Sequence, residues 1–315
     1  MRQKRILITG AGGFVGAALT RRLVADGNAV HVLLKSSTGR WRLADLHPHL
    51  RAHEVDLADE DAVRRLVSEV RPELVYHLAA HGAYPSQNDP DRIIQTNILG
   101  TWNLLKALGQ IDYEAFVSAG SSSEYGFKQF AMRETDLLEP NSYYAVAKCA
   151  QTLLCQHVAR TEKRPINTLR IFSAFGPREE PTRLVPTLIQ RCLQGQELLL
   201  VPPETARDFV YVDDVVDAFL RVEQLAKLQG EVINIGTGLQ GTVRDVVEAI
   251  VRHTGAHVEC RWGAMQPRIW DSAIWVADCT RSKTLLGWRA QTTLDEGLRR
   301  TVAWARSGES RGEVQ

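Results

Sequence analysis

A short apolar run followed by three spaced glycines constrains the fold of this chain most strongly. Residues 5–9 (RILIT) are typical of a buried strand, and residues 17–24 (AALTRRLV) have the apolar spacing of an amphipathic helix. Gly10, Gly13 and Gly16 lie between them in a G-x-x-G-x-x-G pattern rather than G-x-G-x-x-G. A strand, a glycine-rich turn and a helix in this order predict a dinucleotide-binding unit.

Each glycine has its own use in such a turn. We expect Gly10 to allow the tight turn, Gly13 to let backbone amides approach a pyrophosphate, and Gly16 to let the helix pack closely on the strand. The start of a helix offers free amides and a positive dipole to phosphate groups. The predicted cofactor-binding residues of this turn are therefore Gly10, Gly13, Phe14, Val15 and Gly16.

The first half of the chain alternates between strand-like and helix-like segments, and this alternation predicts a doubly wound parallel α/β sheet. After about residue 172 the order loosens, and helices are expected near 183–194, 212–225, 242–254 and 293–306. For the first half we expect strands near 5–9, 29–34, 51–55, 73–79, 114–118 and 166–171, and helices near 14–26, 59–69, 90–109 and 142–161.

Tyr144 and Lys148 lie four residues apart within the predicted helix 142–161. This spacing places both side chains on one face of the helix. A nearby ammonium favours the phenolate form of a tyrosine, so such a pair can exchange a proton with an alcohol or ketone near neutral pH. The spacing alone is common on surface helices, and it gains meaning here from the glycine turn.

Three serines follow the predicted strand 114–118 after a short turn: Ser121, Ser122 and Ser123. Ligands of open parallel sheets bind beyond the carboxyl ends of the strands. A serine hydroxyl in this place can form a hydrogen bond with a substrate oxygen, although one serine by itself would be read as part of a turn.

The glycine turn, the serine cluster and the Tyr/Lys pair together resemble the extended short-chain dehydrogenase/reductase family of nucleotide-sugar epimerases, dehydratases and reductases. The resemblance reaches from the N-terminus to about residue 306. Further matching segments are 77–80 (HLAA), 96–101 (TNILGT), 169–177 (LRIFSAFGP), 207–215 (RDFVYVDDV), 233–238 (INIGTG) and 286–288 (LGW).

The family's organisation implies two interleaved domains and a tail. Residues 1–172 and 209–250 are expected to form an NAD(P)-binding Rossmann domain, and 173–208 and 251–306 a smaller substrate-binding lobe. Residues 307–315 are polar and are expected to fray. A homodimer formed through the 90–109 and 142–161 helices is common in the family and is implied for this chain.

The type of cofactor depends on the residues after the second strand. NAD-dependent enzymes usually carry an acidic residue there, but this chain has Lys35, Ser36 and Arg40 and no carboxylate. A 2′-phosphate could pair with Lys35 or Arg40, so NADP is favoured over NAD, with a solvated basic loop as the alternative. Further cofactor contacts implied by the resemblance are Asp56, Leu57, Leu78, Ala79, Ala80 and Asn97.

The resemblance also implies roles in catalysis and substrate binding. Ser121 would bind the substrate oxygen that Tyr144 protonates or deprotonates, and Lys148 would hold the nicotinamide ribose. Ser173 stands where many members carry an asparagine that touches the diphosphate of a nucleotide-diphosphate sugar. The remaining expected substrate contacts are His81, Tyr84, Ser122, Ser123, Arg207 and Arg268, the two arginines because guanidinium suits bidentate phosphate contacts.

Several reactions remain open within the family. Ser122 and Ser123 occupy the places where 4,6-dehydratases carry their acidic residues, although one deletion in the loop would bring Glu124 into a dehydratase or decarboxylase position. An epimerase would retain NAD and reduce the other face of a 4-keto sugar. The basic residues after the second strand favour instead an NADPH-dependent 4-ketoreductase acting on a 4-keto-6-deoxysugar. A non-catalytic NADP sensor or scaffold is the alternative of another class.

Composition narrows the class of protein further. A chain of 315 residues with 44% hydrophobic content can bury a large core, and a net charge of +1 gives no strong attraction to nucleic acid or membranes. No apolar stretch is long enough for a membrane span, and the five cysteines and nine histidines show no metal-binding spacing. We therefore expect a cytoplasmic enzyme with reduced thiols and no metal site.

Overall fold

The computed structural model describes residues 3–35, 40–84, 86–265 and 273–307. Ser36, Arg268 and the side chain of Arg40, all expected to bind ligands, lie outside the described part. The chain folds into two compact units. Unit 1 comprises Met1–Gly126, Leu137–Ile171 and Val216–Ile233, and unit 2 comprises Phe127–Asp136, Phe172–Val215 and Asn234–Gln315.

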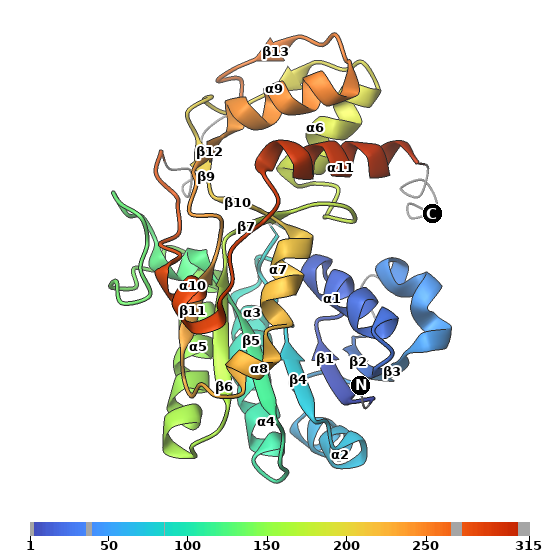
Figure 1. Ribbon diagram of the computed structural model, residues 1–315, viewed down its shortest axis with the longest axis vertical. Helices are drawn as coiled ribbons and strands as arrows, with labels where there is room; N and C mark the ends of the chain where they lie inside the picture. The colour runs from blue at the N-terminus through green and yellow to red at the C-terminus, as the bar shows by residue number, and fades with distance from the viewer. Residues whose placement is uncertain (1–2, 36–39, 85, 266–272, 308–315) are drawn as a thin grey trace. The chain divides into compact units, whose positions relative to one another are not determined.

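A seven-stranded parallel sheet has the order β11-β6-β5-β4-β1-β2-β3 (Figure 1). The chain turns from one half of the sheet to the other between β1 and β4, the switch point where ligands of such sheets bind. The predicted doubly wound parallel sheet is therefore confirmed. The strands are β1 (Arg5–Thr9), β2 (Ala29–Leu34), β3 (Arg51–Glu54), β4 (Leu74–His77), β5 (Ala115–Ser121), β6 (Ile166–Ile171) and β11 (Val232–Ile235).

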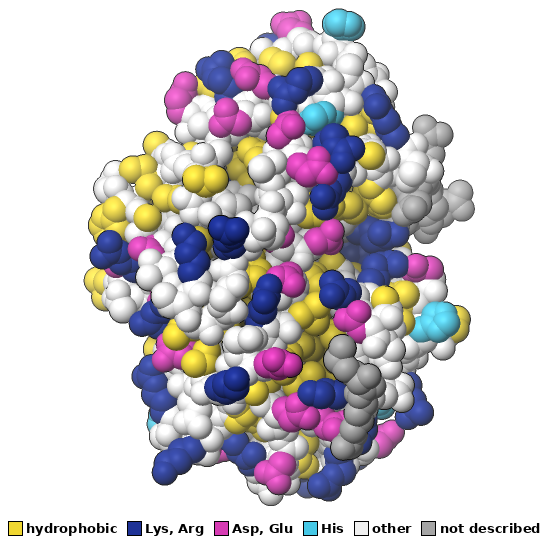
Figure 2. Space-filling view, viewed as in Figure 1, with side chains coloured by type: hydrophobic (Ala, Val, Ile, Leu, Met, Phe, Trp, Pro, Cys, Tyr) yellow, Lys and Arg dark blue, Asp and Glu magenta, His cyan; other side chains and the backbone are white. Residues whose placement is uncertain are grey.

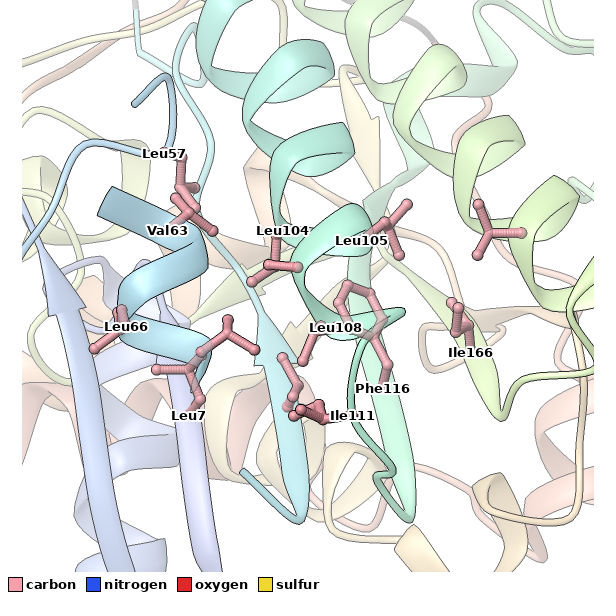
Figure 3. Close-up of a cluster of buried hydrophobic side chains, with 14 of the residues drawn as sticks. Leu7, Leu57, Val63, Leu66, Leu104, Leu105, Leu108, Ile111, Phe116 and Ile166 are labelled. Atoms are coloured by element: carbon pink, nitrogen blue, oxygen red, sulfur yellow. The ribbon is translucent and has the colours of Figure 1, made fainter. Parts of the chain in front are cut away.

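The register of the sheet brings apolar residues into rows. Leu7, Val75, Phe116 and Ile166 are paired in sequence across β1, β4, β5 and β6. Side chains alternate between the two faces of a strand, so this row lies on one face. There it packs with the inner sides of helices α2 (Glu60–Val70), α4 (Gly100–Leu108) and α5 (Tyr143–Thr161) in a buried cluster (Figure 3).

The next row of the same register faces the other side of the sheet. It contains Ile8, Tyr76 and Asn167. The ring of Tyr76 meets that of Phe219 edge-on, with centroids 6.2 Å apart, and Asn167 Nδ2 donates to the carbonyl of Leu225 at 2.9 Å. Both faces of the sheet are thus covered, as a parallel sheet requires.

The helices of unit 1 begin at residues suited to capping. Asp59 caps α2 by accepting a hydrogen bond from the Ala62 amide at 2.9 Å, and Ser142 caps α5 in the same way through Ala145 at 3.1 Å. Each such cap contributes about 1 kcal/mol. The helices are α1 (Phe14–Ala25), α2 (Glu60–Val70), α3 (Pro90–Ile94), α4 (Gly100–Leu108), α5 (Tyr143–Thr161) and α8 (Val222–Leu225).

The single helix predicted over 90–109 is wrong in one respect, because a π-helical turn, η2 (Gln95–Leu99), separates α3 from α4. The amide of Gly100 bonds to the carbonyl of Gln95, five residues back. The Thr101 hydroxyl also donates a hydrogen bond to the Asn97 carbonyl at 2.6 Å.

Unit 2 is built on three helices, α6 (Leu184–Leu193), α9 (Val243–Thr254) and α11 (Leu294–Arg306), which share one buried apolar cluster. The predicted helix 212–225 is interrupted, because α7 (Val212–Phe219) ends before α8 begins.

The sequence analysis also missed three helical elements in the described residues: α10 (Thr280–Leu286) and the 3-10 helices η1 (Arg40–His49) and η3 (Ser122–Tyr125). Short strand pairs complete the fold: β7 (Ser173–Phe175) with β10 (Phe209–Tyr211), β9 (Ala206–Arg207) with β12 (Gly241–Thr242), and β8 (Leu198–Leu199) with β13 (Cys260–Arg261).

Two of the sequence segments quoted above meet inside unit 2 at a buried carboxylate. Asp208 accepts hydrogen bonds from the Thr237 amide at 2.7 Å and the Gly238 amide at 3.0 Å, and a third from Ala277 at 3.1 Å. A side chain on Gly236 would place its Cβ 2.6 Å from this carboxylate. The glycine of the INIGTG segment therefore leaves room for the aspartate of the RDFVYVDDV segment.

The surface carries a mixture of charges. Lysine and arginine side chains are interspersed with aspartate and glutamate over the face seen in Figure 2. The near-equal numbers of the two signs give the net charge of +1. Within the described residues, every helix is too short or too polar to span a membrane.

Candidate active site

The glycine turn after β1 is shaped by close contacts. Gly10 has a φ of +71°, and a Cβ there would lie 2.4 Å from the Ala79 amide nitrogen. A Cβ on Gly16 would lie 2.1 Å from the Gly10 carbonyl oxygen. Gly13 is the N-cap of α1 and has no side chain to occupy the first amides of the helix, and the first turn carries no acidic residue. This backbone fits an anionic pyrophosphate.

The basic residue after β2 is engaged with an acidic residue after β3. Lys35 Nζ and Asp56 Oδ2 are 2.6 Å apart. Burial alone would raise the pKa of Asp56, but the Lys35 ammonium and the Ala58 amide outweigh it and lower that pKa. Leu57, the next expected contact, is buried at 3% exposure. Lys35 is therefore partly neutralised where a 2′-phosphate was expected to bind.

Ser121 ends β5 and caps the 3-10 helix η3. Its hydroxyl oxygen accepts a hydrogen bond from the Ser123 amide at 3.1 Å, and its own amide donates to Glu124 Oε1 at 2.8 Å. These two bonds form a capping box. Ser122 is buried and Ser123 is half-buried, so the three serines have different surroundings although they are adjacent in the chain.

Glu124 is fully buried at 0% exposure. Besides the Ser121 amide, its carboxylate accepts a hydrogen bond from the Thr152 hydroxyl at 2.9 Å and from Arg170 Nε at 2.8 Å. The Arg170 guanidinium in turn lies over the ring of Tyr125, 4.7 Å from its centroid. The carboxylate is thus occupied on both oxygens.

Helix α5 carries Tyr144 and Lys148 on successive turns. Tyr144 is half-buried, and Lys148 is 2% exposed. Lys148 Nζ donates to the Ala119 carbonyl of β5 and, at 2.8 Å, to Gln151 Oε1. Gln151 Nε2 donates to the Ser118 hydroxyl at 2.8 Å. Burial lowers the pKa of Lys148 to about 8, while the Glu124 carboxylate opposes that shift, so the ammonium form prevails at neutral pH.

The end of β4 is fixed by a chain of hydrogen bonds through a buried histidine. The Thr9 hydroxyl contacts His77 Nδ1 at 2.7 Å and accepts from the Ala79 amide at 3.2 Å. His77 Nε2 contacts the Thr101 hydroxyl at 2.9 Å, and that hydroxyl donates to Asn97. Because the Thr101 hydroxyl donates its proton to Asn97, its oxygen accepts from Nε2, which must therefore carry a proton. Burial, with a smaller effect of Lys148, lowers the pKa of His77 to about 3.

Asn97 holds the loop that follows β4. Its side chain accepts from the His81 amide and donates to the His81 carbonyl, each at 2.8 Å. The next residue, Gly82, has a φ of +96°, and a Cβ there would lie 3.3 Å from Cβ of Tyr144. The loop therefore lies against Tyr144. The residues of this segment expected to contact cofactor or substrate are all half-buried: Leu78, Ala79, Ala80, His81 and Tyr84.

The expected substrate residues of unit 2 lie on two short strands. Ser173, on β7, donates its amide to the Asp208 carbonyl at 3.0 Å. Arg207, on β9, donates to the Ala206 carbonyl at 2.6 Å, and its guanidinium lies over the ring of Trp275, 5.2 Å from the centroid. Trp275 was not expected from the sequence.

The model of the NAD dependent epimerase/dehydratase family matches residues 6–236. This chain belongs to that family. A UDP-glucose 4-epimerase of Mycolicibacterium smegmatis is 31% identical over 313 residues, covering 96% of this chain and 99% of the relative. The crystal structure of a UDP-glucose 4-epimerase from Thermotoga maritima with UDP-glucose is 32% identical, with a TM-score of 0.88 over 96% of this chain and 98% of that one.

A second solved relative bears on the cofactor. The UDP-glucose 4-epimerase of Thermus thermophilus in complex with NAD is 30% identical, with a TM-score of 0.84 over 96% of this chain and 99% of that one. The family assignment inferred from the sequence is thereby confirmed.

Several residues that organise the site were missed by the sequence reasoning. Gln151 and Thr152 follow Lys148 by three and four residues, so all three share one side of α5. Polar residues at this spacing normally indicate a solvated face, whereas here they are buried against β5 and η3. Arg170, in the LRIF segment, was visible in the sequence, but nothing indicated that its partner would be Glu124.

Proposed function

We propose that this protein is a nucleotide-sugar 4-epimerase that retains NAD. The observation that carries the proposal is the state of Glu124. Elimination of water from a sugar requires an acid and base beside Ser121, but Ser122 and Ser123 occupy those places and both Glu124 oxygens are engaged with Ser121, Thr152 and Arg170. Tyr144 then remains as the proton-transferring group expected from the family, which suits oxidation and reduction at one carbon.

The similarity to UDP-glucose 4-epimerases over nearly the whole chain supports this proposal over the 4-ketoreductase favoured by the sequence. The argument for NADPH rested on the absence of a carboxylate after β2 and on the basic residues Lys35 and Arg40 there. Lys35 is paired with Asp56, which weakens its suitability for a 2′-phosphate. NAD is the cofactor that an epimerase retains from one turnover to the next, and it is the cofactor named for the Thermus relative.

The residues of unit 1 fit a bound dinucleotide. The amides of Phe14, Val15 and Gly16 at the start of α1 would hold its pyrophosphate. When bound, its nicotinamide ring supplies a reversible hydride acceptor for carbon 4 of the sugar. The Tyr144 side chain, in its phenolate form, would accept the proton of the 4-hydroxyl group as that carbon is oxidised, and the resulting phenol would return the proton as the carbon is reduced.

Lys148 and Ser121 would support this proton transfer. A buried ammonium favours the phenolate form of a neighbouring tyrosine, and Lys148 lies one turn of α5 beyond Tyr144. The Ser121 hydroxyl would donate a hydrogen bond to the substrate oxygen. In unit 2, Arg207 and Ser173 would contact a nucleoside diphosphate hexose, with UDP-glucose as the first compound to test because of the named relatives.

A homodimer is part of the same proposal. Unit 1 exposes large apolar side chains on two successive helical segments, with Leu99 50% and Trp102 40% exposed before or on α4, and Val146 49% and Leu153 56% exposed on α5. Val146 and Leu153 are seven residues apart and form one stripe. Covering these side chains with a second copy of the chain would remove apolar surface from water.

The test is conversion of UDP-galactose to UDP-glucose by the purified protein without added cofactor, together with mass spectrometry of any extracted nicotinamide nucleotide. We expect multiple turnovers with NAD recovered from the protein. Tyr144→Phe should lower kcat by about 10²–10⁴-fold because the proton-transferring hydroxyl is lost. Tyr143→Phe, at the neighbouring exposed position, is the matched control and should remain active.

Other outcomes would point to the alternatives. Stoichiometric loss of NADPH with a nucleotide 4-keto-6-deoxysugar would indicate a ketoreductase. A protein that binds cofactor but turns over neither substrate would fit a sensor or scaffold. A fully active Tyr144→Phe variant would overturn the catalytic assignment.

A further inference from the structure

We propose that Glu124 is a positioning residue: its buried carboxylate sets the place and orientation of Ser121 relative to the helix that carries Tyr144 and Lys148. This inference rests on the function proposed above and deepens it. Glu124 itself touches no substrate in this scheme, and it acts through Ser121.

The first argument is the number of elements joined at one carboxylate. Oε1 accepts from the Ser121 amide at the end of β5, while Oε2 accepts from Thr152 on α5 and Arg170 on β6, all between 2.8 and 2.9 Å. Thr152 lies one turn of α5 beyond Lys148. The position of Ser121 relative to α5 is therefore fixed by two bonds to one rigid, fully buried group.

The second argument concerns the direction of the Ser121 hydroxyl. Its oxygen already accepts a hydrogen bond from the Ser123 amide at 3.1 Å. A hydroxyl carries one proton and two lone pairs, so this contact uses one acceptor position and leaves the proton available. The capping box thus presents Ser121 to a substrate oxygen as a hydrogen-bond donor, which is what a developing alkoxide requires.

The third argument is that capping alone does not need this arrangement. A single turn of 3-10 helix is capped well enough by an exposed glutamate, whereas burying a carboxylate with a guanidinium incurs a desolvation penalty that the ion pair often fails to recover. Arg170 is 3% exposed and is also stacked on Tyr125. A buried pair retained at such a cost is explained by the need for a fixed geometry beside Ser121.

Glu124 also influences charge in the site. Its carboxylate raises the pKa of Lys148 against the lowering effect of burial. The other titratable groups that act on or respond to Lys148 are Cys155, on α5, and His77, at the end of β4. Loss of the Glu124 charge should therefore favour neutral Lys148 and shift the alkaline limb of the activity profile to lower pH.

The test is a double-mutant cycle on UDP-galactose turnover with Ser121→Ala, Glu124→Gln and the double variant. Glutamine replaces one carboxylate oxygen by an NH2 group. Because the charged Arg170 favours the remaining oxygen at its own position, the NH2 group should face the Ser121 amide, which is itself a donor. We expect Ser121→Ala to lower kcat by about 10²-fold and Glu124→Gln by about tenfold with KM within about twofold, since substrate-binding groups are untouched. At a pH below the alkaline limb of every variant, where Lys148 stays charged, the double variant should be no slower than Ser121→Ala, because Glu124 then acts only through Ser121.

A merely structural role for Glu124 predicts a different pattern. Its effect would then multiply with that of Ser121→Ala and would follow the loss of thermal stability. Asn167→Ala is the matched control, because it removes a buried side-chain hydrogen bond elsewhere on β6. We expect this control to lose stability with kcat within about twofold of the unmodified protein. Multiplicative effects, or an equal loss of kcat in the control, would overturn the proposal.

Amide exchange separates failure of this inference from failure of the proposed function. If UDP-galactose is not turned over, the proposed function fails, but exchange of the Ser121 amide still reports on its bond to Glu124. We expect protection in the unmodified protein and at least about tenfold faster exchange in Glu124→Gln, with the amides of β6 unchanged. An unprotected Ser121 amide, or one indifferent to Glu124→Gln, would overturn the positioning role.

Discussion

At the scale of single residues, Gly13 and Gly16 separate cofactor binding from folding. Gly16→Ala would place a Cβ 2.1 Å from the Gly10 carbonyl, whereas at Gly13 the nearest atom lies at 3.2 Å. We expect Gly16→Ala to lower the free energy of unfolding by about 3 kcal/mol or more, because backbone must move. Gly13→Ala should lower it by less than about 1 kcal/mol and weaken NAD binding instead.

Denaturant unfolding and calorimetric titration with NAD, each performed on both variants, measure these effects. Equal losses of stability would contradict the separate roles of the two glycines. The comparison is well controlled, because both changes add one methyl group within the same turn.

Residue types and spacings predicted the candidate site residues, but they did not predict which groups each of these residues contacts. Gly10 has a positive φ and Gly16 lies too close to the Gly10 carbonyl for a Cβ, whereas the approach of Gly13 to a pyrophosphate stays a prediction. Glu124 illustrates the limit of such reasoning. Its partner Arg170 lies 46 residues away in the chain, and only the pairing of β5 with β6 brings them together. The roles assigned to Ser121, Tyr144 and Lys148 remain predictions.

At the scale of elements, two stacked histidines, His31 on β2 and His53 on β3, lie side by side on the paired strands. Nδ1 of His31 and Nε2 of His53 are 3.0 Å apart, and their rings are stacked. Burial, with contributions from His53 and Arg51, lowers the pKa of His31 to about 4, and burial lowers that of His53 as well. Below pH 6.5 these two histidines are therefore protonated in the unfolded chain while they stay neutral in the folded chain.

The contribution of these histidines to the free energy of unfolding should be fully present above about pH 6.5. It should fall as the pH drops toward 4, by up to about 1.4 kcal/mol per pH unit for each histidine. Buried His77 contributes in the same direction. Urea unfolding between pH 7.5 and 4.5 measures the slope. His31→Gln should reduce it and exposed His257→Gln should not; an unchanged slope in His31→Gln would show that the pair is not its source.

The order of the elements in unit 1 followed from the hydrophobic pattern, because alternating buried strands and amphipathic helices leave few other folds. The interruptions did not follow. Nothing in the sequence of residues 90–109 signals a π-helical turn, and nothing in it indicates that Asn97 would bond to His81, which lies 16 residues earlier in the chain. Similarly, η1 and α10 lack the apolar periodicity from which helices were predicted.

At the scale of the whole molecule, the exposed apolar stripe of unit 1 predicts the state of assembly. We expect the protein to sediment as a dimer, and Leu153→Glu to give monomers because it would place a charge in the buried interface. Analytical ultracentrifugation over a range of concentrations measures this. Phe130→Glu, at an exposed apolar position outside the stripe, is the control and should leave the dimer intact. A monomeric unmodified protein would contradict the assignment.

The π-helical turn has a consequence for how this family can vary. An α-helix advances about 100° per residue, so one residue more or less between Gln95 and Gly100 rotates everything beyond it by about a quarter of a circle. Asn97, within the turn, holds the loop at His81, and Thr101 after the turn contacts both Asn97 and His77. The next residue, Trp102, is exposed at the surface. A single insertion or deletion between Asn97 and Gly100 would therefore redirect the exposed surface of α4 and would also remove Thr101 from Asn97 and His77. The length of this turn thus links the surface that α4 offers to a second copy of the chain with the geometry at the end of β4.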